Sequence, residues 1–206
     1  MKANEYIIVI GRQFGAGGRE VGHALAERLS LPYYDKELLR EAARQSGIRE
    51  EVFRNADESR PSFLGRLFGL GASGTVESYT TSAMSRSGLY KAQSEVVEEI
   101  ASRGPCVLVG RTADYVLREM SNLVSLFLHA PLDKRAVRIV GRGNCATEQD
   151  ARQMAQKRDR LRESYYNFFT GRHWGHADNY HLSIDASSMT TQQIVDFIVS
   201  YLENKK

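Results

Sequence analysis

Short apolar runs alternate along the chain with stretches in which apolar residues recur at helical spacing. The runs are rich in β-branched residues and end at glycine, proline or charge, which is typical of buried strands. Five strands are predicted, at 6–10, 32–34, 106–109, 123–128 and 181–184. Helices are predicted at 17–29, 38–47, 89–102, 112–118, most of 133–166 and 190–202. Apolar strands separated by helices predict an α/β fold with a parallel sheet covered on both faces.

One segment departs from this alternation. Residues 60–88 contain Pro61, five glycines and many serines and threonines, with weak apolar periodicity. This composition is typical of loops, so we predict a loop-rich insertion at about 60–88. Because 206 residues suit one folding unit, we expect residues 1–206 to form a single domain that carries this insertion.

Composition narrows the class of protein. Hydrophobic residues make up 42% of the chain and charged residues 26%, which suits a buried core. The apolar run Tyr6–Ile10 is far shorter than a membrane span of about 20 residues, and too short for an export signal. The 2 cysteines exclude a disulfide-dense scaffold and a four-cysteine zinc site. We therefore expect a cytoplasmic protein with no membrane partner.

Positive charge is concentrated in one segment. The net charge of +3 does not by itself imply a nucleic-acid partner. From Lys134 to Arg172, however, the sequence contains ten basic residues and only four acidic ones. We predict that this segment, and its part at about 142–172 in particular, faces an anionic ligand.

In parallel sheets, ligands bind beyond the carboxyl ends of the strands. Topology therefore selects a first set of candidate residues: Gly11–Gly18, Asp35, Gly110, Arg111, His129 and Asp185. Residues 11–18, here called the glycine loop, join the first strand to the first helix. Glycines there allow a sharp turn and expose backbone N–H groups to an anion at the helix N-terminus.

The glycine loop partly fits two known patterns. The phosphate-binding G-x-x-x-x-G-K-[ST] loop has its glycine in Gly17, but Gly18 stands where the lysine belongs. The spacing of Gly11, Gly15 and Gly17 also matches short-chain dehydrogenases, in which Asp35 would bind a ribose. Those enzymes need a Tyr-x-x-x-Lys pair in mid-chain, whereas this chain has that spacing only at Tyr201–Lys205, beyond the last strand. The dehydrogenase interpretation is therefore disfavoured.

Three further motifs complete a pattern. They are Tyr34-Asp35-Lys-Glu-Leu-Leu-Arg40, Val109-Gly110-Arg111 with Asp114, and Lys157-Arg158-Asp159-x-x-Arg162. Together with the glycine loop they resemble the cytidylate kinase-like family of P-loop nucleoside monophosphate kinases, over nearly the whole chain. The resemblance implies a P-loop NTPase-like three-layer fold with a five-stranded parallel sheet and an arginine-rich helical lid at about 142–172.

The resemblance also implies roles for individual residues. ATP would bind to the glycine loop and the residues that follow it, namely Gly11, Phe14, Gly15, Ala16, Gly17, Gly18, Arg19 and Glu20. The acceptor, a nucleoside monophosphate such as CMP, would bind to Asp35, Arg40, Gly110, Arg111, Asp114 and Asp159. Arg158 and Arg162, one helical turn apart, would clasp the transferring phosphates of Mg²⁺-bound ATP.

The departures from the family pattern leave alternatives open. The loop lysine is missing, Glu20 stands near the position of a Mg²⁺-binding Ser or Thr, and no metal ligand is assigned. Arg19 could replace the lysine as a catalytic cation, because a guanidinium binds phosphate bidentately. The chain could instead be a nucleotide-binding regulatory module without kinase activity. A third alternative is that the basic segment binds an RNA or a protein.

Overall fold

The computed structural model describes residues 2–35, 77–110 and 112–205. Its strands are β1 (Ile7–Arg12), β2 (Tyr33–Tyr34), β3 (Val107–Val109), β4 (Leu123–His129) and β5 (Leu182–Asp185). Its helices are α1 (Gly18–Leu29), α5 (Glu77–Ser102), α6 (Ala113–Val116), α7 (Leu132–Gly141), α8 (Glu148–Thr170) and α9 (Thr191–Asn204). Two 3-10 turns, Ala3–Glu5 and Ala177–Asn179, complete the described elements.

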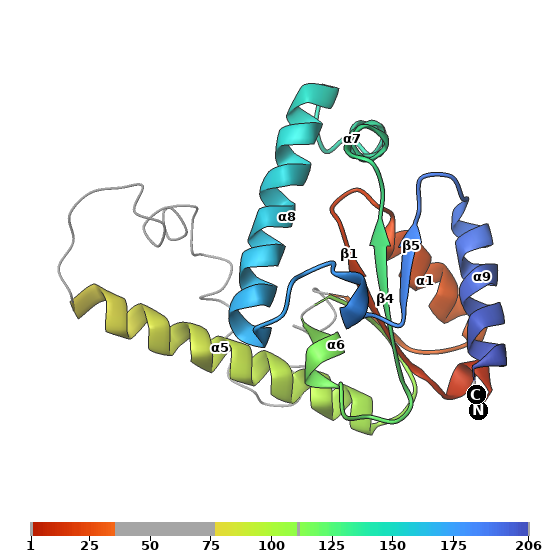
Figure 1. The fold of residues 1–206 in the computed structure, drawn as a ribbon, viewed down its shortest axis with the longest axis horizontal. Coiled ribbons are helices and arrows are strands. Elements are labelled where there is room, and N and C mark those ends of the chain that lie inside the picture. The colour runs from red at the N-terminus through yellow and green to blue at the C-terminus, as the bar shows by residue number, and fades with distance from the viewer. Residues whose placement is uncertain (1, 36–76, 111, 206) are drawn as a thin grey trace.

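The five strands form one parallel sheet in the order β2-β3-β1-β4-β5 (Figure 1). This arrangement confirms the predicted α/β class and the parallel sheet. The central strand β1 pairs with β3 on one side and β4 on the other, and Ile8, Val9 and Ile10 are fully buried. Chain crossovers therefore place the carboxyl ends of all strands along one edge of the sheet.

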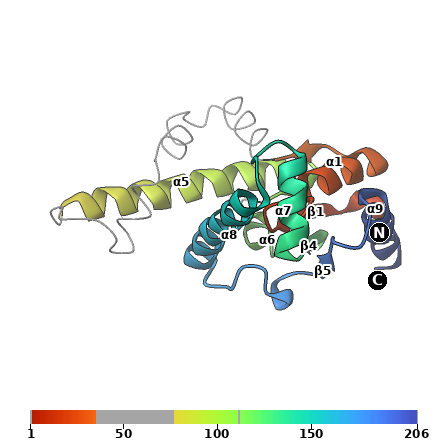
Figure 2. The same cartoon turned by 90° about the horizontal axis from the view of Figure 1, so that it is seen from above.

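Helices cover both faces of the sheet, which makes three layers (Figures 1 and 2). On one face, α1 and α9 pack their buried residues, such as Leu25 and Ile198, against β1 and β4. On the other face, α5 contributes Val96 and Ile100 to a second core, and α6 contributes Ala113. Apolar side chains at helical spacing on one face of each helix explain this packing.

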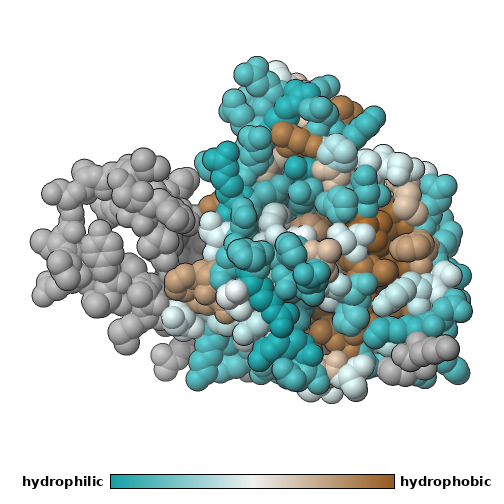
Figure 3. Space-filling model, viewed as in Figure 1, coloured by the Kyte–Doolittle hydropathy of each residue, from teal (hydrophilic) through white to brown (hydrophobic). Residues whose placement is uncertain are grey.

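The helices α7 and α8 pack against each other and cross at a large angle, with α7 beyond the carboxyl end of β4 (Figures 1 and 2). A small apolar cluster holds them together, with Ala136 and Ile139 of α7 against Ala151 and Ala155 of α8. The Thr147 hydroxyl caps α8 by accepting the Asp150 N–H, which fixes where the helix starts. The exposed surface of this pair is largely hydrophilic (Figure 3).

One prediction was wrong in its bounds. The helix predicted at 89–102 begins at Glu77, so residues 77–88 are helical and not loop. The N-terminal half of α5 runs beyond the sheet (Figures 1 and 2), and a helix there needs no continuous apolar stripe. Gly88 costs such a helix only about 1 kcal/mol. Residues 60–76 and the helix predicted at 38–47 lie outside the described residues.

Candidate functional site

The glycine loop turns sharply between β1 and α1. Gly15 and Gly17 have φ values of +83° and +93°, in the left-handed region that side chains disfavour. Gly17 caps α1, whose first turn begins at Gly18 and so presents N–H groups with no acceptor inside the helix. Such a turn is an anion-binding site because the N–H groups and the helix dipole both favour negative charge.

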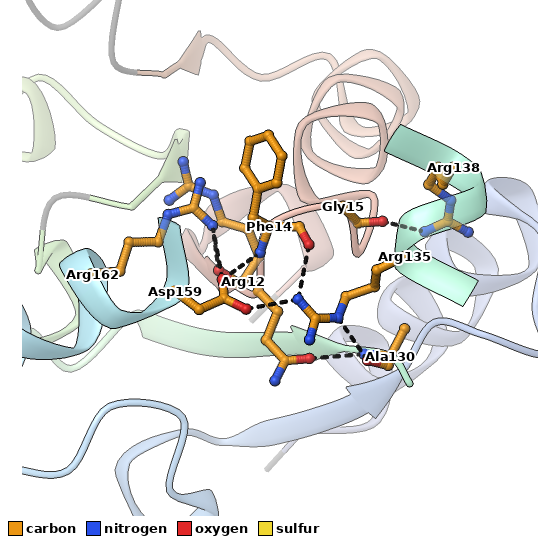
Figure 4. A network of polar contacts seen from close by, with 9 residues as sticks. Arg12, Phe14, Gly15, Ala130, Arg135, Arg138, Asp159 and Arg162 are labelled. Atoms are coloured by element: carbon orange, nitrogen blue, oxygen red, sulfur yellow. Dashed lines mark hydrogen bonds and ion pairs between the residues drawn. The ribbon is translucent and has the colours of Figure 1, made fainter. Parts of the chain in front are cut away.

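The lid helix α8 is bonded directly to the glycine loop (Figure 4). The Phe14 N–H donates to Asp159 Oδ1 at 2.7 Å. Arg162 Nη1 donates to the Arg12 carbonyl at 2.9 Å and lies 3.9 Å from Asp159 Oδ1. These contacts join residues about 145–150 positions apart and hold the start of the loop against the lid.

A buried arginine of α7 completes this contact (Figure 4). Arg135 Nη1 donates to Asp159 Oδ2 at 2.7 Å and to the Phe14 carbonyl at 3.1 Å, while its Nε donates to the Ala130 carbonyl at 2.9 Å. The side chain is only 7% exposed. Asp159, predicted to bind the acceptor, therefore contacts the glycine loop, which was predicted to bind ATP.

A second arginine of α7 lies across the loop. Arg138 Nη1 donates to the Gly15 carbonyl at 3.3 Å, and its Nη2 donates to the Ala186 carbonyl at 3.4 Å. The sequence prediction counted Arg135 and Arg138 only as part of the basic segment. Their spacing of one helical turn, directly after a strand end, was the signal that could have identified both.

Four arginines from three helices lie close enough to act on one another beside the glycine loop, and two of them, Arg135 and Arg162, contact Asp159. We call Arg19, Arg135, Arg158 and Arg162 the arginine cluster. Burial lowers the pKa of Arg162, and the charges of Arg158, Arg19 and Arg135 lower it further, whereas Asp159 raises it. Burial also raises the pKa of Asp159, against the opposing effects of the Phe14 N–H and Arg135.

Two of these arginines, Arg158 and Arg162, lie above the ring of Phe14. The guanidinium carbons of Arg158 and Arg162 lie 5.7 Å and 5.6 Å from the ring centroid. Cation–π contact of this kind positions both guanidinium groups without neutralising them. The prediction that Arg158 and Arg162 share one face of a helix and one target is consistent with this geometry.

Other predicted residues gather at the carboxyl end of β2. Arg19 Nε lies 3.3 Å from Asp35 Oδ2. The pKa of Tyr33 is raised to about 12, first by burial and then by Asp35, while Arg19 and Arg12 lower it. Glu20, in the first turn of α1, pairs with Arg142 of the lid. Arg40 and Arg111 lie outside the described residues.

Asp114 lies beneath the base of the lid. It is 7% exposed, and the Tyr166 hydroxyl of α8 donates to its Oδ2 at 2.7 Å. Burial raises its pKa to about 6, while Tyr166 and Arg172 act in the opposite direction. Asp114 thus links α6, which follows Gly110, to α8.

The aromatic residues after the lid motif pack the lid onto the body. Tyr90 of α5 stacks on Phe169 with ring centroids 4.3 Å apart, and Tyr165 lies 4.8 Å from Phe169. Trp174 meets Phe127 of β4 edge-on at 5.2 Å. Each of these contacts packs one aromatic side chain against another within the fold.

Comparison with known proteins now identifies the family. Residues 7–188 match the cytidylate kinase-like family. The chain belongs to that family. A curated relative, the uronate isomerase of Corynebacterium glutamicum, is 31% identical over 111 residues, which are 54% of this chain and 21% of that protein. The chain thus matches about a fifth of the length of that relative.

Solved structures support the same fold. An uncharacterised protein from Eubacterium ventriosum ATCC 27560 superposes with a TM-score of 0.72 at 25% identity, covering 97% of this chain and 99% of that one. A gluconokinase from Sinorhizobium meliloti 1021 gives 0.55 at 18% identity, covering 97% and 92%. A shikimate kinase from Acinetobacter baumannii, solved with shikimate, gives 0.51 at 18% identity, covering 98% and 96%. The fold is therefore that of P-loop kinases.

In the ranges 2–35, 77–110 and 112–205, three or more His, Cys, Asp or Glu side chains nowhere come together as a metal-binding group. In the same ranges, no helix combines the length and apolar character needed to cross a membrane.

Proposed function

We propose that this member of the cytidylate kinase-like family transfers the γ-phosphoryl group of Mg²⁺-bound ATP to a nucleoside monophosphate such as CMP. The observation that carries the proposal is the arginine cluster at the glycine loop, in which the charges of guanidinium groups from α1, α7 and α8 act on one another. Arg135 and Arg162 contact Asp159, and Arg19 contacts Asp35. Their mutual repulsion is relieved when a polyanion binds among them.

The donor side follows from the loop geometry. The N–H groups at the start of α1 would bind the β- and γ-phosphates of ATP, and the charge of the helix N-terminus would add to that attraction. Arg158 and Arg162, held above Phe14, would neutralise the charge that spreads over the transferring phosphoryl group. Asp159 and Arg135 would hold the loop in the conformation that exposes these N–H groups.

The acceptor side is formed by strand ends next to the loop. Asp35 directly follows β2, and Gly110 directly follows β3, the neighbour of β1. The family resemblance implies that Arg111, Arg40 and Asp114 would contact the acceptor monophosphate. We propose that the acceptor approaches across this edge, so that its phosphate oxygen attacks the γ-phosphorus directly, without a covalent enzyme intermediate.

The described carboxylates fit a Mg²⁺ ion that arrives with ATP. Such ions take one or two carboxylates together with phosphate oxygens and water, so a larger cluster of ligands is not required. Asp35 and Glu20 both lie beside the first turn of α1, each next to an arginine. Bound Mg²⁺ would neutralise phosphate charge, and Asp35 or Glu20 would hold it.

A coupled assay tests the proposal. Purified protein is incubated with Mg²⁺-ATP and with CMP, dCMP, UMP, AMP or GMP, and acceptor-dependent formation of ADP is measured. Arg158→Gln should lower kcat/KM at least about 100-fold, because it removes one cation from the transition state. Arg160→Gln, an equal loss of charge at an exposed position of the same helix, should change it less than about threefold.

Three outcomes contradict the proposal. Calorimetric binding of ATP without turnover of any acceptor would instead support a regulatory module. If Arg158→Gln and Arg160→Gln lose equal activity, Arg158 has no special part in the transfer. Salt-sensitive retention of a nonspecific oligonucleotide at physiological ionic strength would favour the nucleic-acid alternative.

A further inference from the structure

The space next to the first residue of α1 is filled by another side chain. A Cβ atom added to Gly18 would lie 2.6 Å from Arg12 Cγ, 2.8 Å from Arg12 Cβ and 3.3 Å from Arg12 Cδ. The stem of Arg12, the last residue of β1, therefore passes over the position at which phosphate-binding loops carry their lysine. A lysine at position 18 and an arginine at position 12 would compete for the same volume.

The guanidinium of Arg12 lies beyond that helix end. It packs against Gly110, where Nη1 occupies the space of the missing Cβ. Gly110 directly follows β3, has a φ of +86° and begins the turn that leads to α6. The charge of Arg12 also acts on Tyr33 at the end of β2. Its guanidinium thus lies between the start of α1 and the proposed acceptor side.

The main chain of Arg12 is fixed from both sides. Its Cα pairs in register with Leu128 of β4, and its carbonyl accepts from Arg162 Nη1 at 2.9 Å. Arg19, which the sequence analysis proposed as the substitute for lysine, has its Nε next to Asp35 at the end of β2. Its side chain is 54% exposed.

We propose that Arg12 is the catalytic cation of the glycine loop, reaching the β- and γ-phosphates of ATP across the space that Gly18 leaves open. This inference rests on the proposed function. Gly18 and Arg12 act as a pair, in which the glycine admits the arginine stem and the arginine supplies the charge. A planar guanidinium can bridge oxygens of two phosphates, which suits a group that approaches the chain of phosphates from the side.

An exchange of the two residues tests the pairing. Arg12→Gly removes the cation, and Arg12→Gly combined with Gly18→Lys returns one at the usual position. Arg12→Gly should lower kcat at least about 100-fold and weaken ATP binding about tenfold or more. The kcat of the double variant should be at least about tenfold higher than that of Arg12→Gly. Gly18→Lys alone should be impaired, because the lysine collides with the Arg12 stem.

Further variants control for folding and for loss of charge. Arg12→Gln keeps most of the stem, so its thermal midpoint should match the wild type while its kcat falls with that of Arg12→Gly. Arg28→Gln, an exposed arginine in the last turn of α1, should leave kcat and the Kd for ATP within about threefold. Arg19→Gln should cost less in kcat than Arg12→Gln.

The measurements separate this inference from the proposed function. If the wild type binds ATP by calorimetry while folded Arg12→Gln binds and turns over as well as wild type, the inference is overturned and the proposed function stands. A larger loss in Arg19→Gln than in Arg12→Gln, or no recovery in the folded exchange variant, overturns it equally. A wild type that binds no ATP overturns both.

Discussion

At the scale of single residues, the geometry of the site depends on Arg12, whose side chain fills the space that a side chain at position 18 would need. Gly18 is not needed for its backbone conformation, since it lies in ordinary helix geometry at the start of α1. It is needed because Arg12 passes within 2.6 Å of where its Cβ would be. A glycine is therefore needed at position 18 because of steric contact with Arg12, and not because of backbone strain.

Gly18→Ala tests that statement independently of any activity. The added methyl should destabilise the fold by about 1–3 kcal/mol, because the nearest atoms include Arg12 Cβ, which cannot swing away. In an Arg12→Gly background the same change should be neutral or stabilising, since alanine favours a helix over glycine by up to about 1 kcal/mol. Urea unfolding of the four proteins of this double-mutant cycle measures the coupling. Additivity within about 0.5 kcal/mol would disprove the contact.

At the scale of elements, α8 is fastened to the body by a carboxylate that burial makes costly to ionise. Asp114 of α6 accepts from Tyr166 of α8, and its pKa is raised to about 6 from an ordinary 3.8. Between these values the folded state binds more protons than the unfolded state. The contribution of Asp114 therefore destabilises the protein progressively as pH rises from about 4 to 6, by about 3 kcal/mol in total.

Asp114→Asn should remove this dependence. The amide oxygen can still accept the Tyr166 hydroxyl, and no charge is buried at neutral pH. We expect the free energy of unfolding of the variant, relative to wild type, to rise between pH 4 and 6 and then stay constant. Asp196→Asn, at an exposed position on α9, controls for general charge effects. A difference between variant and wild type that does not change with pH would exclude Asp114 as the titrating group.

Sequence patterns predicted the elements better than they predicted the contacts between them. The strands and most helices follow local periodicity, and the fold class, the glycine loop and the shared face of Arg158 and Arg162 could be derived from it. The hydrogen bond from Phe14 to Asp159 joins residues 145 positions apart, and no local sequence pattern predicts it. Arg12 resembles any polar residue at the end of a strand until the structure places it over Gly18. The start of α5 was missed because a helix that extends beyond the core needs no apolar residues at helical spacing, which is the signal used to predict helices.

At the scale of the whole molecule, the pair α7–α8 is joined to the glycine loop mainly by polar contacts. Asp159, Arg135 and Arg162 each form a hydrogen bond with the loop, while Phe14 and Leu132 border the small apolar cluster of the pair. Because the arginine cluster repels itself, this junction gains stability from an anion that lies within it. Binding of a polyphosphate should therefore stabilise the entire fold.

Thermal unfolding with pyrophosphate measures that coupling. At about 100 times its Kd, pyrophosphate should add about 2.7 kcal/mol, which for a chain of this size raises Tm by about 5–10 °C. The rise should shrink with added salt, because the attraction is electrostatic. It should be smaller in Arg158→Gln than in wild type and unchanged in Arg160→Gln, since Arg158 lies above Phe14 and Arg160 is exposed on the same helix. Sodium chloride at the same ionic strength, if it raised Tm equally, would show that the arginine cluster has no preference for linked phosphates.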